Sequence, residues 1–138
     1  MIVKMSKRFL SMRKKIEVLK AVSEPNRIRI LMLLMKKPLC VCEITSILGL
    51  NTSTISSHLS VLKNAGFIID EKEGKWINYK ICDEIDDYNS AVLDVISKYF
   101  SNEPQLIKDL AEIENANRYN LIQIETNGGA NNGLEKRR

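Results

Sequence analysis

Two cysteines separated by a single valine, Cys40 and Cys42, are the side chains of this sequence best suited to chemistry. Thiolates are soft ligands for soft ions. In a reducing compartment, closely spaced cysteines bind metals or respond to oxidation more often than they form structural disulfides. Residues i and i+2 do not face each other on a regular helix, so both sulfurs reach one ion only if the helix start unwinds or twists. The alternative is that both thiols fill space in a core.

The remaining reactive groups do not indicate an enzyme. His58 is the only histidine, and a lone imidazole cannot make a zinc site. The sequence has no glycine-rich phosphate loop, no histidine beside a nucleophile and no recognisable pair of catalytic carboxylates. We therefore expect neither catalysis nor a catalytic cofactor.

The composition is that of a single globular domain. The 138 residues are 44% hydrophobic and 28% charged, which is too apolar for a chain that is disordered as a whole. The longest purely apolar run, Ile30 to Met35, is too short to cross a membrane, and the N-terminus lacks the features of a secretory signal. We expect a cytoplasmic protein with no membrane partner.

The net charge of +4 is unevenly distributed along the chain. Residues 1–81 carry a balance of +9, and residues 82–125 carry a balance of −7. A basic front half suits a surface that binds nucleic-acid phosphates. The alternative is a solvated surface whose charge is simply uneven.

The apolar spacing predicts two helices ahead of the cysteines. The second begins at Pro25, where the missing N–H costs nothing, and ends before Pro38. Apolar residues three or four apart form the stripe of the first helix: Met5, Phe9, Met12, Ile16 and Leu19. The corresponding face of the second helix consists of Ile28, Leu31, Leu34 and Met35.

Two further helices in close succession are predicted around and after the cysteines. A short one runs from Cys42 to Leu48 and stops at Gly49. Asn51 is a preferred N-cap for the next, which starts at Thr52 and ends near Asn64. Its inward face consists of Ile55, Leu59 and Leu62. A short helix, a tight turn and a second helix describe a helix-turn-helix.

The period then changes from helix to strand. The segment FIIDEKEGKWINYKI, residues 67–81, predicts a hairpin around Glu73-Gly74-Lys75. We therefore expect a mainly α fold with a small β-hairpin wing, a winged helix-turn-helix. A further helix is predicted after the hairpin, and its apolar face consists of Ile85, Tyr88, Val92, Val95, Ile96 and Tyr99.

Three regions are expected along the chain. Residues 1–100 would form the DNA-binding and dimerisation domain, and residues 101–125 a helical extension. Pro104 breaks the preceding helix, and a weaker helix is predicted over residues 105–116. Residues 126–138 are polar and glycine-rich, which predicts a disordered tail.

The second helix of the helix-turn-helix is expected to read DNA. Small hydroxyl side chains near a helix N-terminus can bond phosphates and base edges without blocking close approach to the major groove. The residues expected to touch DNA are Thr52, Ser53, Thr54, Ser56, Ser57 and Lys63, with Lys72 and Lys75 on the wing. His58 would make a phosphate or base contact, or else a structural hydrogen bond. The alternative is that these residues merely decorate an exposed helix, although serine and threonine are mediocre helix formers.

Three segments between residues 16 and 82 belong together: LKAVSEPNRIRILMLL, PLCVCEITSILGLNTSTISSHLSVLKNAGFI and EGKWINYKI. In this order they closely resemble the ArsR/SmtB family of arsenic- and metal-responsive repressors. It implies a homodimeric winged-helix repressor that binds inverted-repeat operator DNA and leaves it when an inducer binds. The dimer interface would combine the first helix with the helix at residues 85–100.

The resemblance also implies a role for the cysteines. Cys40 and Cys42 match the thiols that bind As(III) or Sb(III) in the arsenite-sensing branch, whose third clustered cysteine is replaced here by Thr45. In winged helices the stretch corresponding to residues 38–40 often pairs with the second hairpin strand, so Cys82 could complete a three-sulfur site. Cys82 is otherwise a small apolar residue at a strand end.

Other branches of the family, and other kinds of response, remain open. Cadmium and lead sensors add cysteines from the N-terminal arm, whereas residues 1–39 contain none. Zinc sensors use histidines and carboxylates on the last helix, where this chain has no histidine. A redox or persulfide switch would use the thiols without a metal: a Cys40–Cys42 disulfide would be strained, but a Cys40–Cys82 bond is open. A DNA-binding protein of the same fold that responds to no ligand is the last alternative.

Overall fold

The computed structural model describes residues 10–117 of the chain. Met5 and Phe9 of the predicted first stripe, the end of the predicted extension and the whole predicted tail lie outside these residues. The elements are α2 (Met12–Ala21), α3 (Pro25–Lys36), β1 (Leu39–Cys40), α4 (Val41–Leu48), α5 (Thr52–Asn64), β2 (Ile68–Glu73), β3 (Trp76–Ile81), α6 (Asp87–Phe100) and α7 (Pro104–Ala111). The helix-turn-helix followed by a hairpin is the winged helix that the sequence predicts.

Local sequence signals set the helix boundaries of the DNA-reading half. Glu24 caps α3 by accepting the backbone N–H of Arg27, and Pro25 occupies the first turn. Asn51 caps α5, and its side-chain oxygen accepts the Thr54 N–H at 2.8 Å. Gly49 ends α4 with φ of 74°, a left-handed conformation that L side chains rarely adopt.

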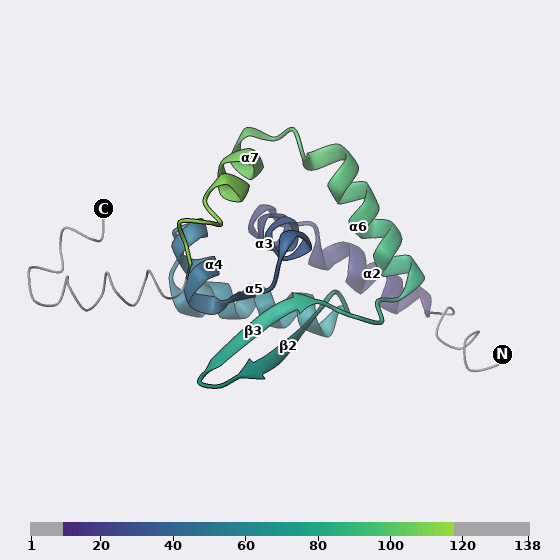
Figure 1. Ribbon diagram of the computed structural model, residues 1–138. Helices are drawn as coiled ribbons and strands as arrows, with labels where there is room; N and C mark the ends of the chain where they lie inside the picture. The colour runs from purple at the N-terminus through teal and green to yellow at the C-terminus, as the bar shows by residue number, and fades with distance from the viewer. Residues whose placement is uncertain (1–9, 118–138) are drawn as a thin grey trace, which may run out of the picture.

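Helix α3 is the centre of the hydrophobic core. Its middle is buried on all sides from Ile30 to Leu34. It contacts α4, α5, α6, α7 and β3, and Figure 1 shows α6 and α7 on one side of it and α4 and α5 on the other. A helix buried all round is fixed by its neighbours, so the positions of α4 and α5 depend on α3.

The sheet has three antiparallel strands in the order β1-β3-β2. Strands β2 and β3 form the projecting wing, with Gly74 at its tip adopting φ of 61° (Figure 1). β1 contributes two residues and pairs Leu39 with Tyr79 and Cys40 with Asn78. The prediction that residues just before the helix-turn-helix pair with the second hairpin strand is therefore confirmed.

The C-terminal extension is tied to α3 by a buried ion pair. Pro104 does not only end the preceding helix, because it occupies the first turn of α7. The Arg29 guanidinium donates to both carboxylate oxygens of Asp109, at 2.7 and 2.9 Å, and the Asp109 side chain is 3% exposed. Gln105 donates to the same carboxylate. The extension is thus packed onto the domain as far as Ala116, which is buried.

Helices α2 and α6 lie next to each other and both expose apolar side chains. The Tyr88 hydroxyl on α6 donates to the Lys15 carbonyl on α2 at 3.1 Å. The exposed large apolar residues on these two helices are Met12, Ile16, Leu19, Val95 and Tyr99. Within residues 10–117 no helix is long and apolar enough to cross a membrane.

Candidate thiol site and DNA-reading surface

Cys40 and Cys42 converge at the junction of β1 and α4. Their sulfur atoms lie 2.7 Å apart, and both cysteines are free. Cys40 is the N-cap of α4, with extended φ and ψ of −88° and 168°, while Cys42 is in the first helical turn. The expectation that the helix must unwind for both sulfurs to meet is therefore wrong, because the extended backbone of the N-cap already turns Cys40 towards Cys42.

The surroundings of the pair keep Cys42 protonated at neutral pH. Cys40 is buried, at 3% exposure. Burial, the hydrogen bond to Cys40 and the nearby charges of Cys40 and Glu43 together raise the pKa of Cys42 to about 12. Cys42 is therefore present as a thiol, and a soft ion must displace its proton to bind.

Glu43 fixes the backbone of the N-cap. Its carboxylate accepts the Cys40 N–H at 2.9 Å, which is one half of a capping box, and Glu43 is 6% exposed. Cys40 also pairs with Asn78 of β3, so its backbone is held from two sides. A ligand that moves the Cys40 sulfur therefore acts on the wing strand and on the start of α4 together.

Thr45 lies one helical turn after Cys42. Its hydroxyl oxygen is buried and has no hydrogen-bond partner among the described residues. Helix α4 packs against α5. The position that carries the third cysteine in the resembling repressors is thus occupied by a buried, unsatisfied hydroxyl.

Cys82 does not join the pair. The register places Cys40 opposite Asn78, so Cys82 lies four residues further along β3 and its continuation, roughly 13 Å away at the usual rise of a strand. Its N–H donates instead to the Phe67 carbonyl. Among residues 10–117 no group of three or more His, Cys, Asp or Glu side chains is placed to hold a metal ion. The idea that strand pairing completes a three-sulfur site within one chain is wrong, because the register pairs Cys40 with Asn78, four residues before Cys82.

The predicted reading face of α5 is largely exposed. Thr52, Ser53, Ser56 and Ser57 are exposed, and Thr54 is partly buried beside the N-cap. The Ser53 hydroxyl donates to Asn51 at 2.9 Å. Ser60 is exposed as well and is absent from the predicted set, although its spacing of four residues from Ser56 places it on the same face.

The lysines of the predicted DNA-reading surface differ in whether they form a salt bridge within the protein. Lys63 forms a salt bridge with Asp70 at 2.9 Å, and the hydrogen bond and charge of that carboxylate raise the pKa of Lys63. Lys72 and Lys75 are exposed at the end of the wing, and the Lys75 ammonium lies 5.5 Å from the centre of the Trp76 ring. A phosphate would have to compete with Asp70 for Lys63 but not for the two wing lysines.

His58 faces the protein interior. Its side chain is 13% exposed, and its Nδ1 lies 3.3 Å from a guanidinium nitrogen of Arg27. Because arginine only donates, Nδ1 accepts this hydrogen bond. Nε2 lies 3.9 Å from the Glu24 carboxylate. His58 thus links α5 to the start of α3, which supports the structural alternative and not the predicted phosphate or base contact.

Comparisons with known proteins agree with this arrangement. Residues 24–70 match the model of the bacterial regulatory protein, arsR family. The chain is 35% identical over 77 residues to the arsenic resistance transcriptional regulator ArsR1 of Pseudomonas putida, covering 55% of this chain and 60% of that protein. It is 31% identical over 80 residues to the arsenical resistance operon repressor of Escherichia coli, covering 57% of this chain and 68% of the repressor.

A solved structure gives the same answer for the fold. The homodimeric winged helix-turn-helix DNA-binding domain of a possible ArsR-family regulator from Mycobacterium bovis superposes with a TM-score of 0.55 at 26% identity. The match covers 67% of this chain and 87% of that domain. The winged helix, the family match and the length of repressor covered together show that this chain belongs to the arsR family of DNA-binding transcriptional regulators and is not an enzyme.

Proposed function

We propose that this protein is a homodimeric repressor that leaves its operator when a thiophilic ion, As(III) or Sb(III), binds Cys40 and Cys42. It would act in the cytoplasm, on inverted-repeat operator DNA. The observation that carries the proposal is the convergence of the two sulfurs, 2.7 Å apart, at the start of the helix that supports α5. The named relatives with arsenic resistance functions support the choice of inducer.

The donor set suits a soft ligand. In a tetrahedral thiolate site, bonds of about 2.3 Å separate two ligating sulfurs by roughly 3.7 Å. The two sulfurs would move apart by about an ångström to hold one ion, a shift within reach of side-chain rotation. With Thr45 in the third position, the third coordination place would be left to solvent or to a small free thiol.

Ligation would act on DNA binding through backbone connections. Any part of this separation that side-chain rotation does not absorb would displace the Cys40 N-cap, which Glu43 and Asn78 hold. α4 packs on α5, so a change in the first turn of α4 shifts the reading face. The DNA contacts would come from Thr52, Ser53, Thr54, Ser56 and Ser57 on α5, with Lys63 and the wing lysines on phosphates.

A second candidate is a thiol switch that responds to an oxidant or persulfide. The same proximity of two free thiols favours it. The raised pKa of Cys42 opposes it, because the thiolate is the reactive form. We therefore place the ion-responsive function first.

Operator binding measured by fluorescence anisotropy tests the proposal. Reduced protein bound to labelled operator would be titrated in turn with arsenite, antimonite, Cd(II) and Zn(II), and separately with a persulfide donor. We expect arsenite and antimonite to release the DNA. Release by Cd(II) alone would instead indicate a sensor of divalent ions. Release by the persulfide donor alone would favour the thiol switch.

Three cysteine variants provide the matched controls. Cys40→Ser and Cys42→Ser should bind operator like the parent protein and lose the arsenite response. Cys82→Ser should keep the response, because Cys82 lies far along β3 from the pair. A full arsenite response in Cys40→Ser or Cys42→Ser would refute the proposed site.

A further inference from the structure

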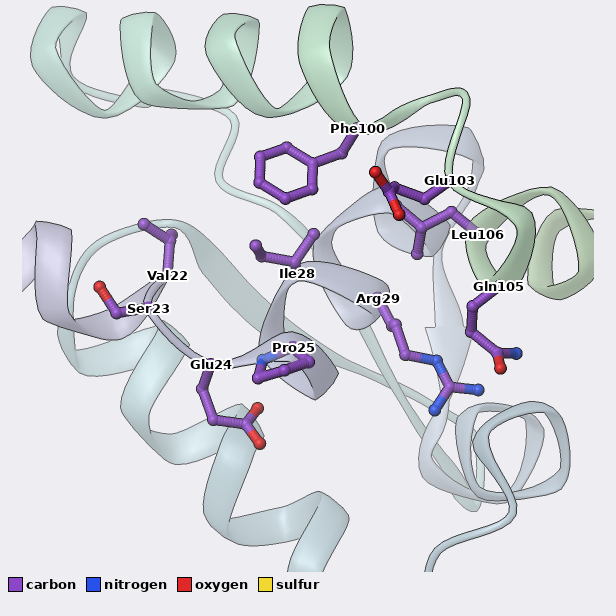
Figure 2. A pocket seen from close by; sticks show the side chains of 10 residues that line it. All are labelled: Val22, Ser23, Glu24, Pro25, Ile28, Arg29, Phe100, Glu103, Gln105 and Leu106. Carbon is purple, nitrogen blue, oxygen red and sulfur yellow. The ribbon is translucent and has the colours of Figure 1, made fainter.

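A cavity of about 510 Å³ lies between the start of α3 and the junction of α6 with α7 (Figure 2). This volume is within the range of sites for small organic molecules. Its walls come from two parts of the chain that are far apart in sequence, residues 22–29 and residues 100–106. It is separate from the cysteine pair, since neither cysteine lines it.

The interior of the cavity is apolar. Figure 2 shows Val22, Ile28 and Phe100 grouped around the same space, with Leu106 beside them. Three of these four residues are partly buried and pack on the hydrophobic core, so their exposed faces form a lining and not a gap in the core. Such a lining takes the apolar body of a ligand.

The charge at the edge of the cavity is negative. Glu24 and Glu103 both line it. Arg29 lines it too, but its guanidinium is already bound by both oxygens of the buried Asp109. The Glu103 carboxylate has no hydrogen bond or ion pair with any residue of the 10–117 range, and Figure 2 shows it near Phe100 and Leu106. A positively charged group complements this edge.

Glu24 connects the cavity to the reading helix. Its carboxylate caps Arg27 at 3.0 Å and lies 3.9 Å from His58 of α5, while the Arg27 side chain contacts the other nitrogen of His58. Because Glu24 lines the same cavity as Val22 and Ile28, a ligand whose apolar part fills that space lies against Glu24 and disturbs this contact between α3 and α5. The cavity therefore has a physical route to the DNA surface that does not pass through the cysteines.

We propose that this cavity is a second effector site, for a small organic cation with an apolar body, and that its occupation weakens operator binding. The ammonium group pairs with Glu103, and the apolar part lies among Val22, Ile28 and Phe100. Residues beyond Phe100 form half of the site, which gives the C-terminal extension a role. The effect on operator binding rests on the proposed DNA-reading function, whereas ligand binding does not.

The test uses the full chain and three probes of one length: n-hexylamine, 1-hexanol and hexanoate. Amide chemical shifts in NMR spectra of the labelled protein report where each probe binds. We expect hexylamine to shift saturably the amides of residues 22–29 and 100–106, and to bind more tightly than hexanol, with hexanoate weakest. Equal binding of all three probes, or no saturable shift at these amides, would overturn the site.

Two variants check the assigned contacts. Glu103→Gln should weaken hexylamine binding by about two- to fivefold, the range for an exposed ion pair, and leave hexanol binding unchanged. Glu114→Gln, the same substitution at an exposed position of the extension outside the cavity, should change neither. Val22→Phe should block all three probes. If Glu103→Gln and Glu114→Gln behave alike, the charge assignment is wrong.

Operator affinity in the presence of saturating hexylamine tests the effector role. We expect the dissociation constant to rise by about threefold or more in the Cys40→Ser/Cys42→Ser double variant as well as in the parent protein. Methylamine at the same concentration controls for salt, since it lacks the apolar body. Hexylamine that binds the cavity without changing operator affinity would overturn the effector role. If only the arsenite response fails, the proposed function is wrong and the proposed cavity site still stands.

Discussion

Cysteine is an unusual residue for the start of a helix, where serine, threonine, aspartate and asparagine are preferred. At Cys40 the side chain gives up a strong cap, and Glu43 compensates by accepting the N-cap N–H. The CVC spacing predicted that two thiols could share one ligand, but helix geometry predicted that they could do so only if the helix start unwinds or twists. What the sequence could not supply was the position of the helix boundary, one residue earlier than predicted, which places Cys40 in extended backbone.

The protonation of Cys42 predicts different pH profiles for the two kinds of ion. The pKa of Cys42 is raised to about 12, so the thiol is protonated throughout the neutral range. A divalent cation must release thiol protons to solvent, and its affinity should rise steeply with pH. With arsenious acid, each thiol proton leaves with a hydroxide as water while an arsenic–sulfur bond replaces an arsenic–oxygen bond, so the affinity should change little.

Titration calorimetry from pH 6 to pH 8 in buffers of different ionisation enthalpy measures this difference. Cd(II) should show net proton release, and arsenite close to none. Net proton uptake with arsenite, together with no proton release with Cd(II), would mean that the thiols are already ionised in the free protein.

Thr45 offers a separate prediction about stability. A buried hydroxyl without a partner costs about 1–3 kcal/mol. Thr45→Val has nearly the same shape and removes that hydroxyl, so it should raise the free energy of unfolding by about 1 kcal/mol. Urea denaturation monitored by circular dichroism measures the change; a loss of stability would show that the hydroxyl is satisfied in solution.

At the scale of elements, the sequence predicted the helix boundaries and the hairpin turn, because neighbouring residues determine both. Pro25, Gly49 and Asn51 mark helix boundaries where the structure has them, and the hairpin turn lies at Gly74. Long-range placements were harder. The inward orientation of His58 depends on Arg27 and Glu24, which belong to the start of another helix. Cys82 was wrongly expected near Cys40, because the sequence of one strand does not determine its pairing register with another. The ion pair between α3 and α7 joins residues eighty positions apart, and no local sequence pattern around either residue predicts it.

Breaking that ion pair should release α7. Asp109→Ala leaves the largely buried Arg29 guanidinium without its carboxylate, which should lower the free energy of unfolding by about 3 kcal/mol. Hydrogen exchange should show lost protection first in α7. In the double variant Arg29→Met/Asp109→Leu no charge is left unpaired, so much of the stability should return. A double variant no more stable than Asp109→Ala would place the cost in packing and not in the orphaned charge.

At the scale of the whole molecule, the exposed apolar residues of α2 and α6 fit the predicted dimer interface. Ile16 and Leu19 on α2 and Val95 and Tyr99 on α6 are between 42% and 66% exposed. Apolar residues gathered in this way on neighbouring helices usually mark an interaction surface. The sequence predicted both stripes from their spacing.

A charge placed in this face should separate the subunits. Val95→Asp should give a monomer in sedimentation velocity and weaken operator binding by more than about tenfold, because an inverted repeat rewards two linked reading heads. Ile107→Asp introduces the same charge at a comparably exposed apolar position on α7, outside this face. If both variants dimerise equally well, the interface lies elsewhere.

The junction of β1 and α4 separates two kinds of specificity. The side chains proposed to recognise the inducer lie before and in the first turn of α4, and those proposed to recognise the operator lie on α5 and the wing. No residue belongs to both sets, and only packing and backbone join them. Natural variation could therefore change the chemical stimulus without changing the promoter that is controlled. A biosensor could be retuned in the same way, by exchanging residues 40–45 alone and keeping the reporter gene's operator as it is.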